Sequence, residues 1–177
     1  MKAYAILDTN VMVSALLSKP GKKTPPLETL SIVLYKKSKI IPVYSDEILE
    51  EYKEVLSRPA FGLSKKRIGK FINDLKKNSI KLERLQNNED FPFPDKDDIV
   101  FYEITLSAQK EGASFLVTGN LKHYPAKKFI VTPSEFIQIL HGKKIEELRE
   151  NNINLIKKKS AQNHPKAQSD DHPFPSD

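Results

Sequence analysis

AILDTNVMVSALLS, residues 5–18, is apolar at both ends and carries Asp8 and Asn10 in its middle. The apolar start is typical of a strand that is buried on both faces, and the residues from Val11 onward have the pattern of a helix. Asp8 and Asn10 therefore lie at the start of a predicted helix, where their side chains can accept hydrogen bonds from free backbone N–H groups. Helix capping explains both residues, so a further role for Asp8 needs support from the rest of the chain.

The rest of the chain alternates between predicted strands and predicted helices. Strands are predicted at 3–7, 39–45, 114–118 and 128–132. Helices are predicted at 11–19, 27–38, 46–58, 64–78, 99–112 and 133–142. This alternation predicts an α/β fold, in which helices cover both faces of a mostly parallel sheet.

Two segments are open to more than one interpretation. Pro42 lies inside the predicted strand 39–45, which indicates an edge strand or an irregular strand end because proline has no backbone N–H. Residues 79–85 suit either a strand or a continuation of the preceding helix.

Length and composition predict one domain with an appendage. Residues 1–142 carry the alternating pattern, and residues 143–177 form a C-terminal extension with a helix predicted at 143–159 and a polar, disordered tail after it. The chain has no Cys, which excludes disulfides and thiolate metal sites. It has no apolar run of the ~20 residues that span a bilayer and no signal-peptide pattern, so we expect a cytoplasmic protein. Its net charge of +6 favours an anionic partner such as nucleic acid.

Polar side chains follow two of the predicted strands. Asp8 comes directly after strand 3–7, and Asn120 follows strand 114–118 after Gly119, which we expect to permit a sharp turn. Ligands of open parallel sheets bind at the carboxyl ends of the strands, so Asp8 and Asn120 are candidates for a ligand site. Taken separately, an N-cap and a turn residue explain them equally well.

Acidic side chains also gather at the start of a predicted helix. Asp95, Asp97 and Asp98 precede Ile99, and the helix that begins there needs one of them as its cap. Asp98 as a plain N-cap is one explanation, and the other two aspartates are then surplus to capping.

Glu51 lies at the edge of the apolar stripe of helix 46–58, whereas Glu50 and Glu54 face solvent. An ordinary surface role explains Glu51 when it is considered by itself. In one domain with Asp8 and the aspartates of the later helix, however, clustered carboxylates would repel one another and would need a cation. Mg²⁺ or Mn²⁺ accepts carboxylate oxygens and keeps water and phosphate as its other ligands. Such an ion can lower the pKa of a bound water and stabilise charge on a phosphodiester.

Five stretches of the chain carry a more specific signal. They are DTNVMVSALL (8–17), SDEILEEYKEVLSRP (45–59), FPDKDDIVFYEI (93–104), LVTGNLKHYP (116–125) and VTPSEFIQIL (131–140). In this order they resemble the PIN-domain ribonucleases, and most closely the branch that contains toxin components of toxin–antitoxin pairs, over residues 3–141. The resemblance implies a three-layer α/β/α domain and Mg²⁺- or Mn²⁺-dependent cleavage of single-stranded RNA. It also implies an antitoxin partner and a homodimer.

The resemblance assigns metal-binding roles to individual residues. Asp8, Glu51 and Asp98 fall on the metal-binding acids of the family, with Asp95 as a frequent companion. Asn120 falls on a fourth position that is often Asp, so the resemblance implies three strong carboxylate ligands in this chain rather than four.

The remaining assignments concern support of the site and RNA binding. Thr9 and Asn10 match the polar pair of the first motif, which orients Asp8 or a bound water. The basic segment 65–84 is either a solvated helix face or a surface that follows the RNA backbone. Its candidate RNA-binding residues, together with one from the loop after strand 114–118, are Lys65, Lys66, Arg67, Lys70 and His123. For His123 a structural role in its loop is the alternative.

Two other functions remain open. A PIN fold without catalysis would bind RNA or a protein partner; Asn120 favours this alternative, and the three acids Asp8, Glu51 and Asp98 disfavour it. A phosphoryl-transfer enzyme could use Asp8 as its nucleophile, but such enzymes often carry a second Asp two residues later, where this chain has Asn10. Metal-assisted hydrolysis without a covalent intermediate is the reaction that we expect.

Overall fold

The computed structural model describes residues 2–35, 39–86, 91–150 and 154. The chain divides into two compact units, Met1–Gly142 and Lys143–Asp177. In the second unit residues 145–150 are helical, within the helix predicted at 143–159. Most of the remainder of that prediction, and the predicted disordered tail, lie outside the described residues. No helix in the described part of the chain is long and apolar enough to cross a membrane.

A five-stranded sheet forms the centre of the first unit. Its strands are β1 (Ala3–Leu7), β2 (Ile40–Tyr44), β3 (Ile80–Lys81), β4 (Ala113–Val117) and β5 (Ile130–Val131), in the spatial order β3-β2-β1-β4-β5. All neighbouring strands are parallel. The central strand β1 is buried on both faces, as its uninterrupted apolar sequence predicts, since Ala5, Ile6 and Leu7 have almost no exposed surface.

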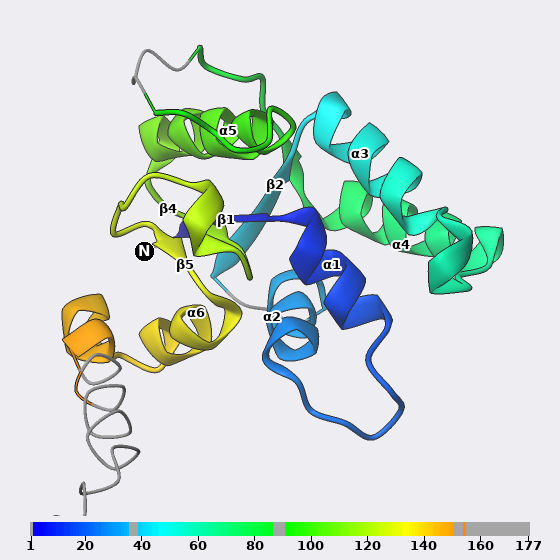
Figure 1. Ribbon diagram of the computed structural model, residues 1–177, viewed down its shortest axis with the longest axis horizontal. Helices are drawn as coiled ribbons and strands as arrows, with labels where there is room; N and C mark the ends of the chain where they lie inside the picture. Colours follow the sequence, from blue (N-terminus) through cyan, green and yellow to red (C-terminus); the bar gives the residue numbers. More distant parts are fainter. Residues whose placement is uncertain (1, 36–38, 87–90, 151–153, 155–177) are drawn as a thin grey trace, which may run out of the picture. The chain divides into compact units, whose positions relative to one another are not determined.

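Helices cover both faces of this sheet, so the predicted α/β/α architecture is confirmed. The helices are α1 (Thr9–Leu16), α2 (Pro25–Leu34), α3 (Asp46–Leu56), α4 (Lys65–Asn78), α5 (Asp98–Glu111) and α6 (Pro133–Leu140), with short 3₁₀ turns η1 (Pro59–Phe61) and η2 (Leu121–His123). Figure 1 shows α5 on one side of the strands and α2 and α6 on the other. Side-chain oxygens cap five of the helices at their N-termini, from Asp8, Thr24, Ser45, Ser64 and Thr132.

The structure decides between the alternatives for Pro42 and for residues 79–85. β2 is an interior strand, so of the two alternatives that Pro42 indicated, an edge strand or an irregular strand end, the edge strand is wrong. β3 pairs with β2 only from Val43 onward. Pro42 lies before this ladder, so its missing backbone N–H costs no hydrogen bond to β3. The segment after α4 forms the short strand β3 rather than more helix.

The order of the strands reverses at β1. From β1 the chain continues to β2 and β3 on one side, and later returns to β4 and β5 on the other. β1 and β4 end level, because Leu7 pairs with Val117 and the Asp8 N–H donates to the Val117 carbonyl at 2.9 Å. Ligands of open parallel sheets bind beyond the carboxyl ends of the strands at such a reversal of strand order, and the residues directly after β1 and β4 lie there.

Candidate active site

Asp8 is both a helix cap and the first polar group beyond β1. Its Oδ1 accepts a hydrogen bond from the Asn10 N–H at 3.1 Å, so the predicted capping role is confirmed. Its Oδ2 accepts from the hydroxyls of Thr118, at 2.7 Å, and Tyr124, at 3.1 Å. Only 4% of the residue is exposed, and this burial raises the pKa of the carboxyl group against the opposing effect of its hydrogen bonds. Capping does not require these two distant partners, so they indicate a second role.

The Thr118 hydroxyl has a fixed orientation. Its oxygen accepts from the Asn120 N–H at 2.9 Å and from the Asn10 side-chain amide at 3.3 Å. A hydroxyl has two acceptor positions and one proton, so this proton must point to Asp8 Oδ2. Asn10, Thr118 and the backbone of Asn120 thus hold Asp8 in one orientation.

Gly119 is needed for a reason other than the one expected from the sequence. Its φ is not positive, so the turn after β4 does not depend on the conformational freedom of glycine. Instead its N–H donates to Asn10 Oδ1 at 2.8 Å, and a Cβ at this position would lie 3.0 Å from the same oxygen. The absence of a side chain lets Asn10 approach the backbone.

We expect Gly119→Ala to destabilise the fold by about 1 kcal/mol, because the methyl group would displace Asn10 from its hydrogen bond. Gly69→Ala is the matched control: it lies in α4, and a Cβ there would meet nothing within 4 Å. This control should stabilise the fold by roughly 0.5–1 kcal/mol through helix propensity. Urea unfolding measures both changes, and a stabilising effect of Gly119→Ala would contradict the close approach of Asn10.

Glu51 is held at the site by its neighbours in sequence and in space. The adjacent Tyr52 is fully buried and its hydroxyl donates to the Leu7 carbonyl, which anchors α3 at the end of β1. The Thr9 hydroxyl then donates to Glu51 Oε1 at 2.5 Å. Burial, followed by the charges of Asp8, Asp97 and Asp98, raises the pKa of Glu51 to about 7, although the Thr9 hydrogen bond opposes the shift.

The neighbouring glutamates of α3 behave differently. Glu50 and Glu54 are exposed, whereas Glu51 is partly buried, so its predicted place at the edge of the apolar stripe is confirmed. The helical period therefore identified the one glutamate of this group that faces the end of β1.

Asp98 is the first residue of α5, and it is not the N-cap. Asp97, another of the three aspartates expected to supply the cap, occupies that position, although its side chain makes no capping hydrogen bond; Asp98 as a plain N-cap is wrong. The Asp98 carboxylate instead contacts His123 Nδ1 at 2.7 Å and accepts from the Tyr124 hydroxyl at 3.2 Å. Burial raises the pKa of Asp98, and Asp8 adds to the shift while His123 opposes it. Asp98 is thus oriented toward the loop after β4 and toward Asp8.

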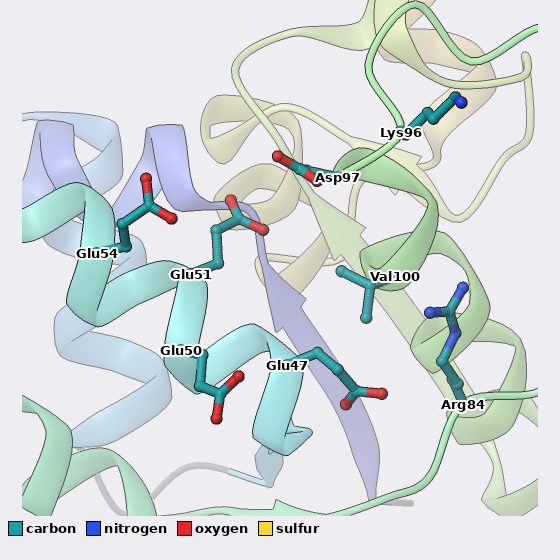
Figure 2. Close-up of a pocket in the computed structure, with 8 residues that line it drawn as sticks. All are labelled: Glu47, Glu50, Glu51, Glu54, Arg84, Lys96, Asp97 and Val100. Atoms are coloured by element: carbon teal, nitrogen blue, oxygen red, sulfur yellow. The ribbon is translucent and has the colours of Figure 1, made fainter.

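A pocket of about 390 Å³ opens beside Glu51. Its walls come from α3, the start of α5 and the segment after β3, and the lining residues are Glu47, Glu50, Glu51, Glu54, Arg84, Lys96, Asp97 and Val100. In Figure 2 the carboxylates of Asp97 and Glu51 point toward each other across it. Arg84 donates from Nε to the buried Glu103 at 2.5 Å. The pocket therefore has an acidic wall on α3 and a cationic group held in place opposite.

The profile of the PIN-domain family matches residues 4–122 of this chain. The match runs from β1 to η2 and includes Asp8, Glu51 and Asp98. This chain belongs to the PIN-domain family. Members of the family are generally nucleases, and their fold is the one described above. A comparison with curated proteins gives no match.

Two further acidic or amide positions of this PIN domain were assigned from the sequence. Asp95 Oδ1 accepts from the Asp97 N–H at 3.0 Å, so the Asp95 side chain stabilises the turn before α5. The aspartate that lines the pocket together with Glu51 is Asp97. The N–H of Asn120 donates to Thr118, while the Asn120 side chain makes no capping hydrogen bond to η2. The backbone of Asn120 thus supports the site, and metal binding by its side chain stays a prediction.

Three of the five candidate RNA-binding residues have partners within the PIN domain. Arg67 donates to the Leu16 carbonyl at 2.6 Å, at the C-terminus of α1, and Lys70 pairs with Asp74 at 2.6 Å. His123 contacts Asp98, so the alternative structural role for it has direct support. Lys65 and Lys66 are exposed, and their role in RNA binding stays a prediction.

The candidate metal ligands of the site are of the chemical type that binds a divalent cation, although they do not form a complete metal-binding site. Within residues 2–35, 39–86, 91–150 and 154, no three Asp, Glu, His or Cys side chains meet closely enough to hold a metal ion. Asp98 is turned to His123 and Tyr124, and Glu51 to Thr9. The donors are nevertheless carboxylate oxygens, and burial and mutual repulsion raise the pKa values of Glu51 and Asp98. Hard ions such as Mg²⁺ and Mn²⁺ prefer these ligands and would relieve that repulsion.

Two residues of the site were not recognised from the sequence. Thr118 directly follows β4, the same position that Asp8 has after β1, and this equivalence could have identified it. Tyr124 carries no comparable signal, because its contacts join residues that lie 116 and 26 positions away.

Proposed function

We propose that this PIN domain is an endoribonuclease that cleaves single-stranded RNA with Mg²⁺ or Mn²⁺. The observation that carries the proposal is that Asp8, Glu51 and Asp98 come from three separate elements and lie near one another beyond β1. Tyr124 contacts both Asp8 and Asp98, and the charges of these two acids help to raise the pKa of Glu51. Burial and, for Glu51 and Asp98, the charges of neighbouring acids cost stability in the absence of a cation. A cation-dependent function explains why such a costly arrangement is present.

Each residue has a defined task in this proposal. Asp8, Glu51 and Asp98 would hold the ion, with Asn120 as a neutral fourth ligand and Asp95 in reserve. When bound, the ion would supply charge stabilisation for the scissile phosphate and a water of lowered pKa. Thr118 and Thr9 orient Asp8 and Glu51 through their hydroxyl protons.

Covalent alternatives are less compatible with the geometry. Asp8 as a phosphoryl acceptor would need an exposed oxygen for in-line attack, but it is 4% exposed and its Oδ2 accepts two hydrogen bonds. Burial between Asp8 and Asp98 raises the pKa of Tyr124 far above its ordinary value, so this phenol is not an anionic nucleophile. Hydrolysis by water is therefore the reaction that we propose.

The narrower biological role rests on the resemblance of the five motif stretches to toxin components. On this basis we propose a cytoplasmic toxin with a protein antitoxin and a homodimeric assembly. Induced expression in a bacterium should then arrest growth, and expression of the Asp8→Asn variant should not. Equal growth with both proteins would contradict the toxin role while leaving the nuclease activity to the assay that follows.

The test of the nuclease proposal is cleavage of a labelled single-stranded RNA by the purified chain. We expect products with Mn²⁺ or Mg²⁺ and none with EDTA, and the activity should return when Mn²⁺ is added in excess. RNA that is bound but never cut, with either ion, would contradict the proposal and favour the alternative of a binding module.

Asn120 provides a further prediction, because it offers a neutral oxygen where many relatives offer a charged one. Asn120→Asp should tighten Mn²⁺ binding about 10-fold, since hard ions bind more strongly as ligand charge increases, and raise the stoichiometry from one toward two. Calorimetric titration of Mn²⁺ measures both quantities. Asn73→Asp adds the same charge at an exposed position of α4 and should change neither. Unchanged affinity in Asn120→Asp would show that this side chain does not face the ion.

A further inference from the structure

The hydroxyl of Tyr124 lies between two carboxylates of the site. It is 3.1 Å from Asp8 Oδ2 and 3.2 Å from Asp98 Oδ1. The ring is 4% exposed and packs edge-on against Phe93, with ring centroids 6.3 Å apart and an interplanar angle of 84°. Core packing therefore fixes the phenol, and its polar end is directed at the site.

Tyr124 differs in this respect from the other groups that contact the same carboxylates. Thr118 holds Asp8, and His123 holds Asp98, whereas Tyr124 contacts both. The two acids come from different elements, Asp8 from the end of β1 and Asp98 from the start of α5. Like charges tend to move apart. The phenol has one proton, which it shares between the two carboxylates in a three-centre hydrogen bond, and this shared bond opposes the movement.

We propose that Tyr124 is the positioning residue that sets the spacing between Asp8 and Asp98, so that both carboxylates can serve one divalent ion. This inference rests on the proposed function in one respect, namely that these acids bind a metal. Groups that orient metal ligands typically change metal affinity by 10–100-fold, although they do not touch the ion. Tyr124 acts through Asp8 and Asp98, and it takes no part in bond making.

The test is the affinity of the full chain for Mn²⁺, measured by calorimetry, in Tyr124→Phe. The ring and its packing remain, so thermal unfolding should change little. We expect the dissociation constant for Mn²⁺ to rise at least about 10-fold, while the maximal rate of RNA cleavage at saturating Mn²⁺ stays within about 3-fold of wild type. Tyr35→Phe is the matched control, because its hydroxyl contacts Asp74 on α4, and it should bind Mn²⁺ like wild type.

A double-mutant cycle separates positioning from a general loss of packing. In an Asp98→Asn background, Tyr124→Phe should weaken Mn²⁺ binding by much less than in wild type, because one of the two groups that it aligns has already been changed. Equal effects in both backgrounds, or wild-type Mn²⁺ affinity in Tyr124→Phe, would overturn the inference.

The outcomes distinguish this inference from the proposed nuclease function. A wild-type chain that binds Mn²⁺ but does not cut RNA would end the nuclease proposal, and the affinity of Tyr124→Phe would still decide the role of Tyr124. A wild-type chain that binds no Mn²⁺ would overturn both.

Discussion

Asp8→Asn should lower the rate of metal-dependent RNA cleavage on the order of 1000-fold. Asn has nearly the same size as Asp and is an equally good N-cap, so the start of α1 should persist. It lacks the charge that would hold the ion, and because one of its two side-chain positions is an NH₂ group, it cannot accept from the Asn10 N–H at Oδ1 and also from Thr118 and Tyr124 at Oδ2, as the carboxylate does. Loss of a hydrogen bond and removal of a buried charge have opposite effects on stability. We therefore expect the free energy of unfolding to change by less than about 2 kcal/mol.

The measurement compares initial cleavage rates at saturating Mn²⁺, with thermal unfolding as the check on folding. Asp74→Asn is the matched control, since Asp74 pairs with Lys70 on α4, outside the site. It should cleave RNA at the wild-type rate. Substantial cleavage by folded Asp8→Asn would show that Asp8 is a cap and no more.

Glu51→Gln should lower cleavage at least about 100-fold, whereas Glu50→Gln should be fully active. The two residues are neighbours in α3 and differ in orientation, because Glu51 accepts from Thr9 and Glu50 is exposed. The pair therefore tests the site itself and removes the same charge from the same helix in both variants. Cleavage assays at saturating Mn²⁺ give the result, and similar rates for the two variants would refute the role of Glu51.

For Glu51→Gln we also predict that stability in the absence of metal depends less on pH than in wild type. The pKa of Glu51 is about 7 in the folded protein against 4.5 ordinarily, so the fold favours the protonated form. The stability from this group is fully present below pH 4.5 and is lost as the pH rises to about 7. The Glu51→Gln variant has no ionisable group at this position, so it does not lose this stability as the pH rises. In EDTA it should therefore exceed wild type by about 1 kcal/mol at pH 8, a value reduced for the partial exposure of Glu51, and the difference should shrink toward pH 4. Urea unfolding across this pH range measures the difference in free energy of unfolding between the two proteins. A difference that does not vary with pH would contradict this account.

Much of the fold could be predicted because its signals are local. Ile68, Phe71, Ile72 and Leu75 have helical spacing and form the buried side of α4, and Ser45 caps α3 as its residue type suggests. Pro42 is the exception in the sheet. It fits an interior strand because the two-residue strand β3 pairs with β2 only after it, and no local pattern encodes where β3 begins.

The site was predictable in part for the same reason. Asp8 and Glu51 were identified from a strand end and a helical period, and both lie where these patterns indicate. Thr118, Tyr124 and the close approach of Asn10 to Gly119 depend on contacts between segments more than 100 residues apart. Such contacts follow from the order of β1 and β4 in the sheet, which the alternation of elements leaves undetermined.

The central claim is that Asp8, Glu51 and Asp98 bind one divalent ion. The most direct measurement is an anomalous difference map at the manganese edge from crystals of the chain grown with Mn²⁺. We predict one strong peak at about 2.1 Å from carboxylate oxygens of all three residues, the distance typical of such hard ions, with Glu51 released from Thr9. A peak elsewhere, or no peak while Glu51 stays bound to Thr9 and Asp98 to His123, would contradict this account.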